Sequence, residues 1–225
     1  MVRKVVAVAA ALCVYQAHAQ VSTSAAFVSD YRYRGVSLSD GQPAAQLSLA
    51  YDSPADGWYV GGMASNVKLA RESGAQVLGY AGISRRFAPE FSWDLGAEYT
   101  QYTGPHHYQY PEIYAGLSYR QISARVYYTN DYFSIGAPVL YAELNGSHNF
   151  TDHWYMFGHM GLLRRNGYPD HNVRMDYRAG VGVSLLSHCD VQLAWTTARG
   201  PEYVHYPVAS GAGRDAWVVS LSYAW

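Results

Sequence analysis

The most constraining feature of this chain is an alternation of apolar and polar side chains that persists over unusually long segments. The clearest case is the last segment, 215–225, with the sequence DAWVVSLSYAW. Its apolar face carries Trp217, Val219, Leu221, Tyr223 and Trp225. Segments 91–99 and 173–185 repeat the scheme, and their apolar faces contain no Lys, Arg, Asp or Glu. Because successive side chains of a β-strand point to opposite faces, the pattern predicts strands with one apolar face.

Similar segments follow one another along the whole chain. They predict twelve strands, at residues 22–34, 44–52, 57–67, 74–87, 91–99, 111–120, 121–131, 138–148, 152–163, 173–185, 190–198 and 215–225. In segments 57–67 and 74–87 apolar residues fall on both faces, so their faces are not assigned. Several predicted strands are longer than the five or six residues usual in soluble proteins. They suit strands that cross a membrane, which need about 9–11 residues.

The connections between the predicted strands alternate in length. SPADG, YRQ and NFTDH are short, whereas GVSLSDGQP, TGPHHYQYP and RGPEYVHYPVASGAGR are long. Bacterial outer-membrane barrels have an even number of strands, short periplasmic turns and long external loops. The predicted fold class is therefore all-β: a transmembrane antiparallel up-and-down β-barrel of about twelve strands, with both termini periplasmic.

A soluble β-sandwich is the alternative fold, because it also alternates apolar and polar residues. The length of the strands and the absence of charge from the apolar faces favour the barrel. In lipid every backbone group needs a hydrogen-bond partner, so a membrane sheet closes on itself. Tyr and Trp settle where hydrocarbon meets headgroups, and the chain contains 22 Tyr and 6 Trp. On this basis Phe27, Tyr31 and Tyr33 are predicted to face the lipid and its border.

The N-terminal segment has the parts of a secretory signal peptide. Two basic residues precede an apolar run at 5–14, and residues 17–19 (AHA) form a small-x-small cleavage site. The predicted domains are a cleaved signal peptide at 1–19 and an outer-membrane β-barrel domain at 20–225. The predicted location is the bacterial outer membrane, reached by export to the periplasm and then insertion. Without the signal peptide Cys189 is the only cysteine, so no intramolecular disulfide is predicted.

Composition limits the partners of the chain. Its formal net charge is -1 and only 15% of its residues are charged, without a basic cluster, which argues against nucleic acid. The expected partners are outer-membrane lipid and lipopolysaccharide, the outer-membrane barrel assembly machinery and small solutes. The sequence leaves the oligomeric state open.

Eleven charged residues are predicted to point into the barrel and line its pore. They are Asp30, Arg32, Arg34, Asp94, Glu98, Glu112, Arg125, Glu143, Arg174, Asp176 and Arg178. Rings of charge in a lumen select which ions or solutes pass. The same charges can instead pair across strands and fill the interior, as in small barrels. A barrel of about twelve strands lies between the filled and the open sizes, so a narrow pore and a plugged lumen are both consistent with the sequence.

Neither catalysis nor metal binding is predicted, and no cofactor is expected. A hydrolase needs a nucleophile and a base within hydrogen-bond reach, but Ser147 and His148 are adjacent on a strand and point to opposite faces. Ser187 and His188 lie in a short turn on the predicted periplasmic side. The histidines of the predicted external loops lack the spacing of a defined metal site. They are His106, His107, His171 and His205.

The residues also carry a family resemblance. SDYRYRGVSLSDGQPA, YDSPADGWYVGGMASNV, WDLGAEYTQY, TNDYF, YAELN and the closing strand resemble a proteobacterial family of proposed porins called TorF-like, also catalogued as Gcw_chp. The resemblance covers residues 22–225, and Met63 stands where a tryptophan is expected. It implies an outer-membrane barrel, but it supplies no substrate and no catalytic residue.

The resemblance further implies an assembly signal at the end of the chain. Outer-membrane proteins commonly end in an aromatic residue on an alternating strand, and the assembly machinery reads that end. Here the signal comprises Trp217, Val219, Leu221, Tyr223 and Trp225.

The predicted function is that of a porin for passive diffusion of small hydrophilic solutes or ions. The alternative is a closed outer-membrane barrel that acts as a structural protein or as an adhesin through its external loops. An outer-membrane enzyme is the third and weakest interpretation. Discrete conductance steps from the refolded protein distinguish the first interpretation from the second.

Overall fold

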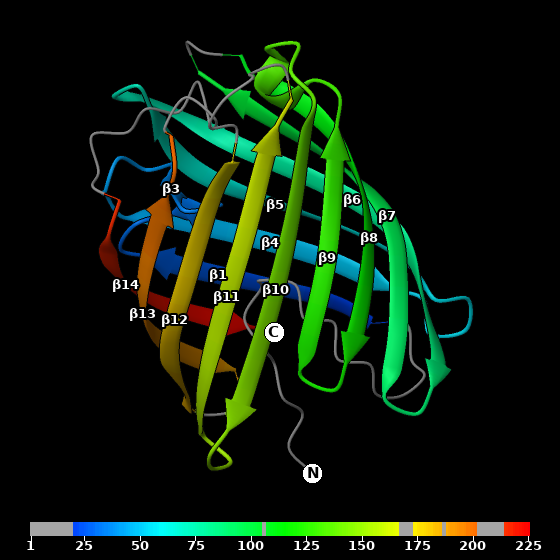
Figure 1. Cartoon of the computed structure of the whole chain (residues 1–225). Helices are drawn as coiled ribbons and strands as arrows, with labels where there is room; N and C mark the ends of the chain where they lie inside the picture. The colour runs from blue at the N-terminus through cyan, green and yellow to red at the C-terminus, as the bar shows by residue number, and fades with distance from the viewer. Residues whose placement is uncertain (1–19, 105–106, 167–172, 186–187, 202–213) are drawn as a thin grey trace.

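The computed structural model describes residues 20–104, 107–166, 173–185, 188–201 and 214–225, and the predicted signal peptide lies outside them. The described residues form a closed barrel of twelve antiparallel strands, which confirms the predicted fold class (Figure 1). The strands are β1 (Gln20–Val28), β4 (Ala44–Asp52), β5 (Trp58–Leu69), β6 (Glu72–Ala88), β7 (Phe91–Thr103), β8 (Gln109–Tyr119), β9 (Ile122–Thr129), β10 (Val139–Asn149), β11 (Trp154–Arg165), β12 (Val173–Leu185), β13 (Cys189–Arg199) and β14 (Ala216–Ala224). A hairpin outside the barrel sheet joins β2 (Arg32–Tyr33) to β3 (Val36–Ser37), and η1 is a 3-10 helix at Tyr132–Ser134. Within the described part of the chain, no helix is long and apolar enough to cross a membrane.

The barrel strands follow one another in chain order, and β14 closes the sheet against β1. The connections therefore lie alternately at the two ends of the barrel. The short-turn end carries the start of β1, the end of β12, the end of β14 and the connections 53–57, 89–90, 120–121 and 150–153. The long-loop end carries the ends of β7, β11 and β13 and the fully described connections 29–43, 70–71 and 130–138. The two-residue connection 70–71 is the exception at this end.

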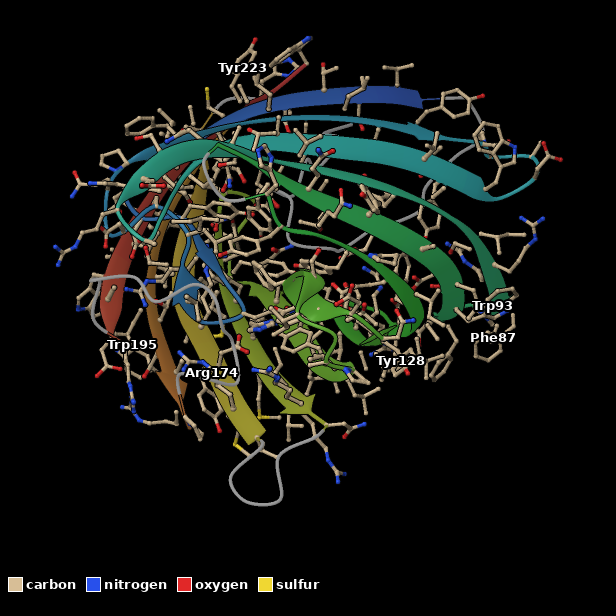
Figure 2. All side chains as sticks on the ribbon, turned by 90° about the horizontal axis from the view of Figure 1, so that it is seen from above. Phe87, Trp93, Tyr128, Arg174, Trp195 and Tyr223 are labelled. Carbon is tan, nitrogen blue, oxygen red and sulfur yellow. The ribbon has the colours of Figure 1, made fainter. Side chains whose placement is uncertain are left out.

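The outer face of the barrel is a broad apolar surface. Trp217 is 67% exposed, and Figure 2 shows Phe87 and Tyr223 at the periphery, pointing away from the barrel. On β7 the side chain of Leu95 is 50% exposed, whereas its neighbour Asp94 is 8% exposed, as the alternation predicts. Soluble monomers rarely expose so much apolar surface. A continuous apolar band around a closed barrel is instead the surface that hydrocarbon requires.

The first strand is shorter than the alternation predicts. β1 ends well before residue 34, and the chain then turns into the barrel. Phe27 faces outward as predicted, at 54% exposure. Tyr31 is only 9% exposed and Tyr33 packs against the buried core, so the prediction that these two rings face lipid is wrong. The physical reason is that Asp30, Ser37 and Ser39 form hydrogen bonds with one another, so the chain bends and does not continue the hydrogen-bond ladder of β1.

The structure assigns the faces of β5 and β6, which the sequence leaves ambiguous. Val77 points outward, whereas Tyr59 and Tyr80 point into the lumen. These inward rings lie over glycines of the neighbouring strand. A Cβ atom on Gly61 would come within 2.5 Å of the Tyr80 ring, and one on Gly82 within 2.5 Å of the Tyr59 ring. The alternation is obscured here because the inner face carries aromatic rings as well as polar groups.

Candidate functional site

The connection between β1 and β4, residues 29–43, folds into the barrel; this segment is the lumen loop. Leu38 is fully buried, and its carbonyl oxygen accepts a hydrogen bond of 2.7 Å from the Lys68 N–H of β5. The Tyr31 hydroxyl donates a hydrogen bond of 2.7 Å to Gln76 Oε1 of β6. Burial raises the pKa of Tyr31 above its ordinary value, so its hydroxyl stays protonated and able to donate. The lumen loop is thus part of the interior of the barrel.

Asp30 holds the lumen loop together from within. Its Oδ1 atom accepts hydrogen bonds from the hydroxyls of Ser37 at 2.5 Å and Ser39 at 3.2 Å. Its Oδ2 atom lies 2.6 Å from Arg32 Nε. The Ser39 hydroxyl oxygen in turn accepts a hydrogen bond of 2.9 Å from the Tyr31 N–H. These bonds tie the first part of the loop to its later part and make it a compact unit.

At the tip of the hairpin, Arg34 reaches across the lumen to β8. Its Nη1 and Nη2 atoms donate to Glu112 Oε1 at 3.1 Å and Oε2 at 2.8 Å, a two-pronged ion pair. The two side chains are 3% and 0% exposed. Strands β4 to β7 separate β8 from β1 in the barrel, so the pair joins the loop to the far wall. Glu98 of β7 faces Glu112 in register, so Arg34 supplies a positive charge beside two acidic side chains.

Tyrosine rings surround the Arg34 guanidinium. Its Cζ atom lies 4.8, 5.2, 5.5 and 4.3 Å from the ring centroids of Tyr33, Tyr127, Tyr132 and Tyr141. Cations are attracted to aromatic faces at such distances. Burial alone lowers the pKa of Arg34, but Glu112 and the neighbouring tyrosines outweigh it, so the net pKa shift is upward. The guanidinium therefore stays charged in its buried position.

Gly35, which follows Arg34, fits the loop tip against another part of the wall. Its φ angle of +75° lies in the left-handed region that glycine adopts without strain. A Cβ atom here would lie 2.5 Å from the Cβ of Asp176 on β12 and 2.8 Å from that of Ala198 on β13. Both the conformation and the close approach therefore require glycine.

A second connection, residues 130–138, also turns inward. Tyr132 and Phe133 of η1 are fully buried. The Phe133 ring stacks on Tyr102 at 5.2 Å, and the Tyr132 ring meets Tyr110 edge-on at 4.8 Å. Figure 2 shows side chains from the walls and loops crowding the interior. At the long-loop end the structure therefore favours the plugged interpretation of the lumen.

A second ion pair lies deeper, between β9 and β7. Arg125 Nη2 is 3.0 Å from Asp94 Oδ2, and the two side chains are 18% and 11% exposed. The Tyr59 hydroxyl lies 2.8 Å from that of Tyr114 and donates to Asp94 at 3.3 Å. Glu143 of β10 faces Arg125 in register. This group is less buried than the Arg34–Glu112 pair, so it retains contact with water.

Strands β10 to β12 carry a histidine cluster. His159 Nε2 lies 2.9 Å from Asp176 Oδ1, and His159 Nδ1 lies 2.7 Å from Asn145 Oδ1. The hydroxyl of Tyr141 is 3.1 Å from His159 Nε2. The cluster links three neighbouring strands through their inward side chains.

A further polar cluster lies on β11 to β13. Asp190 accepts hydrogen bonds from the Tyr155 hydroxyl at 2.7 Å and from Gln192 Nε2 at 3.1 Å. Arg178 Nη2 donates to Gln192 Oε1 at 2.9 Å, and its guanidinium lies 5.0 Å from the Phe157 ring centroid. We call the inner faces of β7 to β13, with these clusters, the charged wall.

The inner face on β14, β1 and β4 is built differently. Its inward side chains include Ser22, Ser24, Ala26, Ser48, Ala50, Ser220 and Ser222. These seven are small, uncharged and at least partly exposed, and the face also carries Gln46 and, at its short-turn end, Asp52. We call this face the smooth wall. Solvent reaches it because its short side chains leave room beside them.

All eleven predicted pore-lining residues lie in the lumen loop or on inward faces of strands. The structure brings six of them together as the ion pairs Asp30–Arg32, Arg34–Glu112 and Asp94–Arg125. Their role in lining a pore stays a prediction. Several members of these clusters were not named as site residues from the sequence, among them Gln76, Tyr141, Asp190 and Gln192. The available signal was their position on the polar side of predicted strands.

The other predicted features are placed as follows. Ser147 and His148 point to opposite faces of β10, as the alternation predicts. The described residues contain no cluster of three or more side chains suited to a metal ion. His107 is described, whereas three predicted loop histidines lie outside the described residues: His106, His171 and His205. The side chains of the predicted assembly signal on β14 and at Trp225 all face outward, and their role stays a prediction.

Comparison with known proteins adds a family and a fold. A model of the family described as "Bacterial protein of unknown function (Gcw_chp)" matches residues 15–225. Comparison with curated proteins finds no match.

Solved structures similar to the chain are outer-membrane barrels. A KdgM porin aligns with a TM-score of 0.52 at 11% identity, over 91% of this chain and 98% of that chain. A NanC porin aligns with a TM-score of 0.56 at 8% identity, over 91% and 99%. An outer membrane channel from Pseudomonas putida F1 aligns with a TM-score of 0.54 at 9% identity, over 93% and 96%. At these identities the likeness shows the fold, which is that of outer-membrane porins and channels.

Proposed function

The chain belongs to the Gcw_chp family, and we propose that it is an outer-membrane channel for passive diffusion of small hydrophilic solutes or ions. The observation that carries the proposal is the contrast between an apolar outer surface and a charged, hydrogen-bonded inner surface on one closed sheet. Such a sheet places a polar interior across a hydrocarbon layer. The porins and channels that share the fold support the proposal, as does the sequence resemblance to TorF-like porins.

The orientation follows from the same proposal. Residues 1–19 act as a signal peptide, and the mature barrel is inserted by the assembly machinery into a membrane of lipid and lipopolysaccharide. The long-loop end faces the exterior, and both termini face the periplasm. The barrel acts without a cofactor and not as an enzyme. The distribution of long and short connections supports this orientation.

The charges of the lumen favour a mild preference for cations. Inward carboxylates outnumber inward guanidinium groups once the structure adds members that the sequence did not single out. The carboxyl groups are Asp30, Asp52, Asp94, Glu98, Glu112, Glu143, Asp176 and Asp190. The guanidinium groups are Arg32, Arg34, Arg125, Arg165, Arg174 and Arg178. An excess of negative charge raises the local concentration of cations in a lumen.

Single-channel recording tests the proposal. The refolded mature chain is added to a planar lipid bilayer under a KCl gradient, and discrete conductance steps are expected. The reversal potential is expected on the cation-selective side. Silence across many insertions of protein that migrates as a folded barrel would contradict the channel function.

A closed barrel that acts as a structural protein or adhesin is the second candidate function. The observation that favours it is the lumen loop, which fills the long-loop end of the interior. If this candidate is correct, the barrel stays silent in the bilayer and also remains silent when the lumen loop is released from the far wall.

A further inference from the structure

We propose that the lumen loop is a movable gate of this channel and that the ion pair between Arg34 and Glu112 holds it shut. The inference rests on the proposed channel function and adds the element that regulates it. Its starting point is the attachment of the loop. Both ends of residues 29–43 join neighbouring strands, β1 and β4, whereas the tip of the loop docks on the opposite wall. Such a segment turns about one edge of the barrel when its tip is released.

The ends of the loop are firmly fastened. The Ser29 N–H donates to the Val219 carbonyl at 2.9 Å, and the Val219 N–H donates to the Ser29 hydroxyl at 2.9 Å. On the other side, the Ala45 N–H donates to Asn66 Oδ1 at 2.6 Å. Between these points Asp40 has a φ angle of +56°, in the left-handed region. The fastened ends define the two places about which the loop turns.

Between its ends, the loop is a self-contained body. Asp30, Ser37 and Ser39 bond to one another, and the Leu38 N–H donates to the Tyr31 carbonyl at 2.7 Å. These bonds are internal, so they persist when the loop moves. The bonds that break are those to the wall. Around the tip they are mainly side-chain contacts, with Arg34 at their centre.

Arg34 is the residue on which the closed position depends most. In the closed position it neutralises Glu112, which faces Glu98 across β7 and β8. Without the guanidinium the buried Glu112 carboxylate loses its ion-pair partner, and the tyrosine rings lose the cation between them. In an open position the side chain of residue 34 is in water, so replacing Arg34 has little effect on the free energy of the open state. Removing the charge therefore destabilises the closed state relative to the open one.

The wall that the loop would uncover is suited to a passage. Gly35 rests against Asp176 of β12 and Ala198 of β13, at the edge of the charged wall that borders β14, and Ala198 is fully buried beneath the loop. The smooth wall continues from the hinge side toward the short-turn end with serines and alanines. Displacement of the loop thus joins the long-loop end to a part of the lumen that solvent already reaches.

The first test measures conductance of Arg34→Gln. The matched control is Arg120→Gln, because Arg120 forms an ion pair of 2.7 Å with Glu90 that is exposed and lies at the short-turn end. Arg34→Gln is expected to raise the fraction of time that the channel is open. Arg120→Gln is expected to match the parent protein.

The second test follows the loop itself and needs no conductance. Val36 is 7% exposed in β3, and Val36→Cys on a Cys189→Ser background places one thiol on the buried side of the closed loop. Its labelling by a membrane-impermeant maleimide is compared with and without Arg34→Gln. The rate is expected to rise at least about fivefold, because an open state populated at about 0.1–10% becomes the major one. Arg120→Gln on the same background is expected to leave the rate unchanged.

The outcomes separate the gate from the channel. Faster labelling together with a larger open fraction in Arg34→Gln supports the gate. An unchanged labelling rate overturns the gate, even if the parent protein conducts. Faster labelling with a silent bilayer for both proteins overturns the channel function and with it the role of the loop as a gate.

Discussion

The charged wall and the smooth wall of the lumen belong to one sheet but differ in the size and charge of their side chains. The charged wall holds ion pairs, tyrosine rings and the glycines beneath them, whereas the smooth wall presents serines and alanines. The lumen loop connects β1 to β4, two strands of the smooth wall, and its tip docks on the charged wall across the lumen. The comparison indicates that bulk and charge are gathered where the loop must be held. The side from which the loop departs stays clear.

The largest expected difference between the walls is in stability. Glu112→Ala removes one partner of a buried ion pair and leaves the Arg34 guanidinium without its two hydrogen bonds to a carboxylate, which costs about 3–5 kcal/mol of unfolding free energy. The smooth-wall control, Ser24→Ala, is expected to stay within about 0.5 kcal/mol of the parent protein. Denaturant unfolding in detergent micelles, followed by tryptophan fluorescence, measures both. Equal stability of the two variants would show that the walls do not differ in this way.

The rings of the charged wall give a smaller effect. A Cβ atom on Gly96 would collide with the Tyr114 ring, so Gly96→Ala is expected to cost about 1–3 kcal/mol through overpacking. Gly79 has open space around its Cβ position, so Gly79→Ala is the matched control. It is expected to change stability by no more than about 1 kcal/mol, in the stabilising direction. The same unfolding assay measures both variants. Similar losses of unfolding free energy in the two variants would contradict the packing of rings over these glycines.

The sequence predicted the barrel because alternation is a local property. Leu95 and Asp94 show their faces directly, since lipid requires one side to be apolar. The same rule misplaced Tyr31 and Tyr33. The bond network around Asp30 joins residues several positions apart, and strand periodicity does not encode such a bend. The alternation predicted the correct face wherever the residue lies in a regular barrel strand.

The candidate site was only partly accessible from sequence for a related reason. Arg34 and Glu112 were both singled out as inward charges, but they are far apart in the chain and nothing in the sequence pairs them. Inward rings such as Tyr80 were not assigned because tyrosine also marks the lipid border, as Tyr223 does on β14. The difference between Tyr80 and Tyr223 is the glycine that faces the Tyr80 ring on the adjacent strand, which becomes visible only with the register.

A bulky residue introduced on the smooth wall tests, through the single-channel conductance, whether solutes pass along that wall. Ser48 points into the lumen from β4, whereas Leu47 on the same strand points outward. Ser48→Trp is expected to lower the single-channel conductance, because the added ring narrows the side of the lumen that is otherwise clear. Leu47→Trp places the same ring on the lipid face and is expected to leave the conductance unchanged. An equal conductance for the two variants would place the passage elsewhere.

The smallest expected effect is a change in ion selectivity, and its size shows which wall a permeating ion passes. Asp94 of the charged wall is already paired with Arg125, so Asp94→Asn is expected to shift the reversal potential only slightly. Ser24 of the smooth wall has no charged partner in register on either neighbouring strand, because it faces Ser48 and Ala224. Ser24→Asp therefore adds an uncompensated carboxylate beside the passage and is expected to increase cation selectivity more than Asp94→Asn decreases it. A larger shift from Asp94→Asn would mean that ions travel along the charged wall, and the division of labour between the walls would then be reversed.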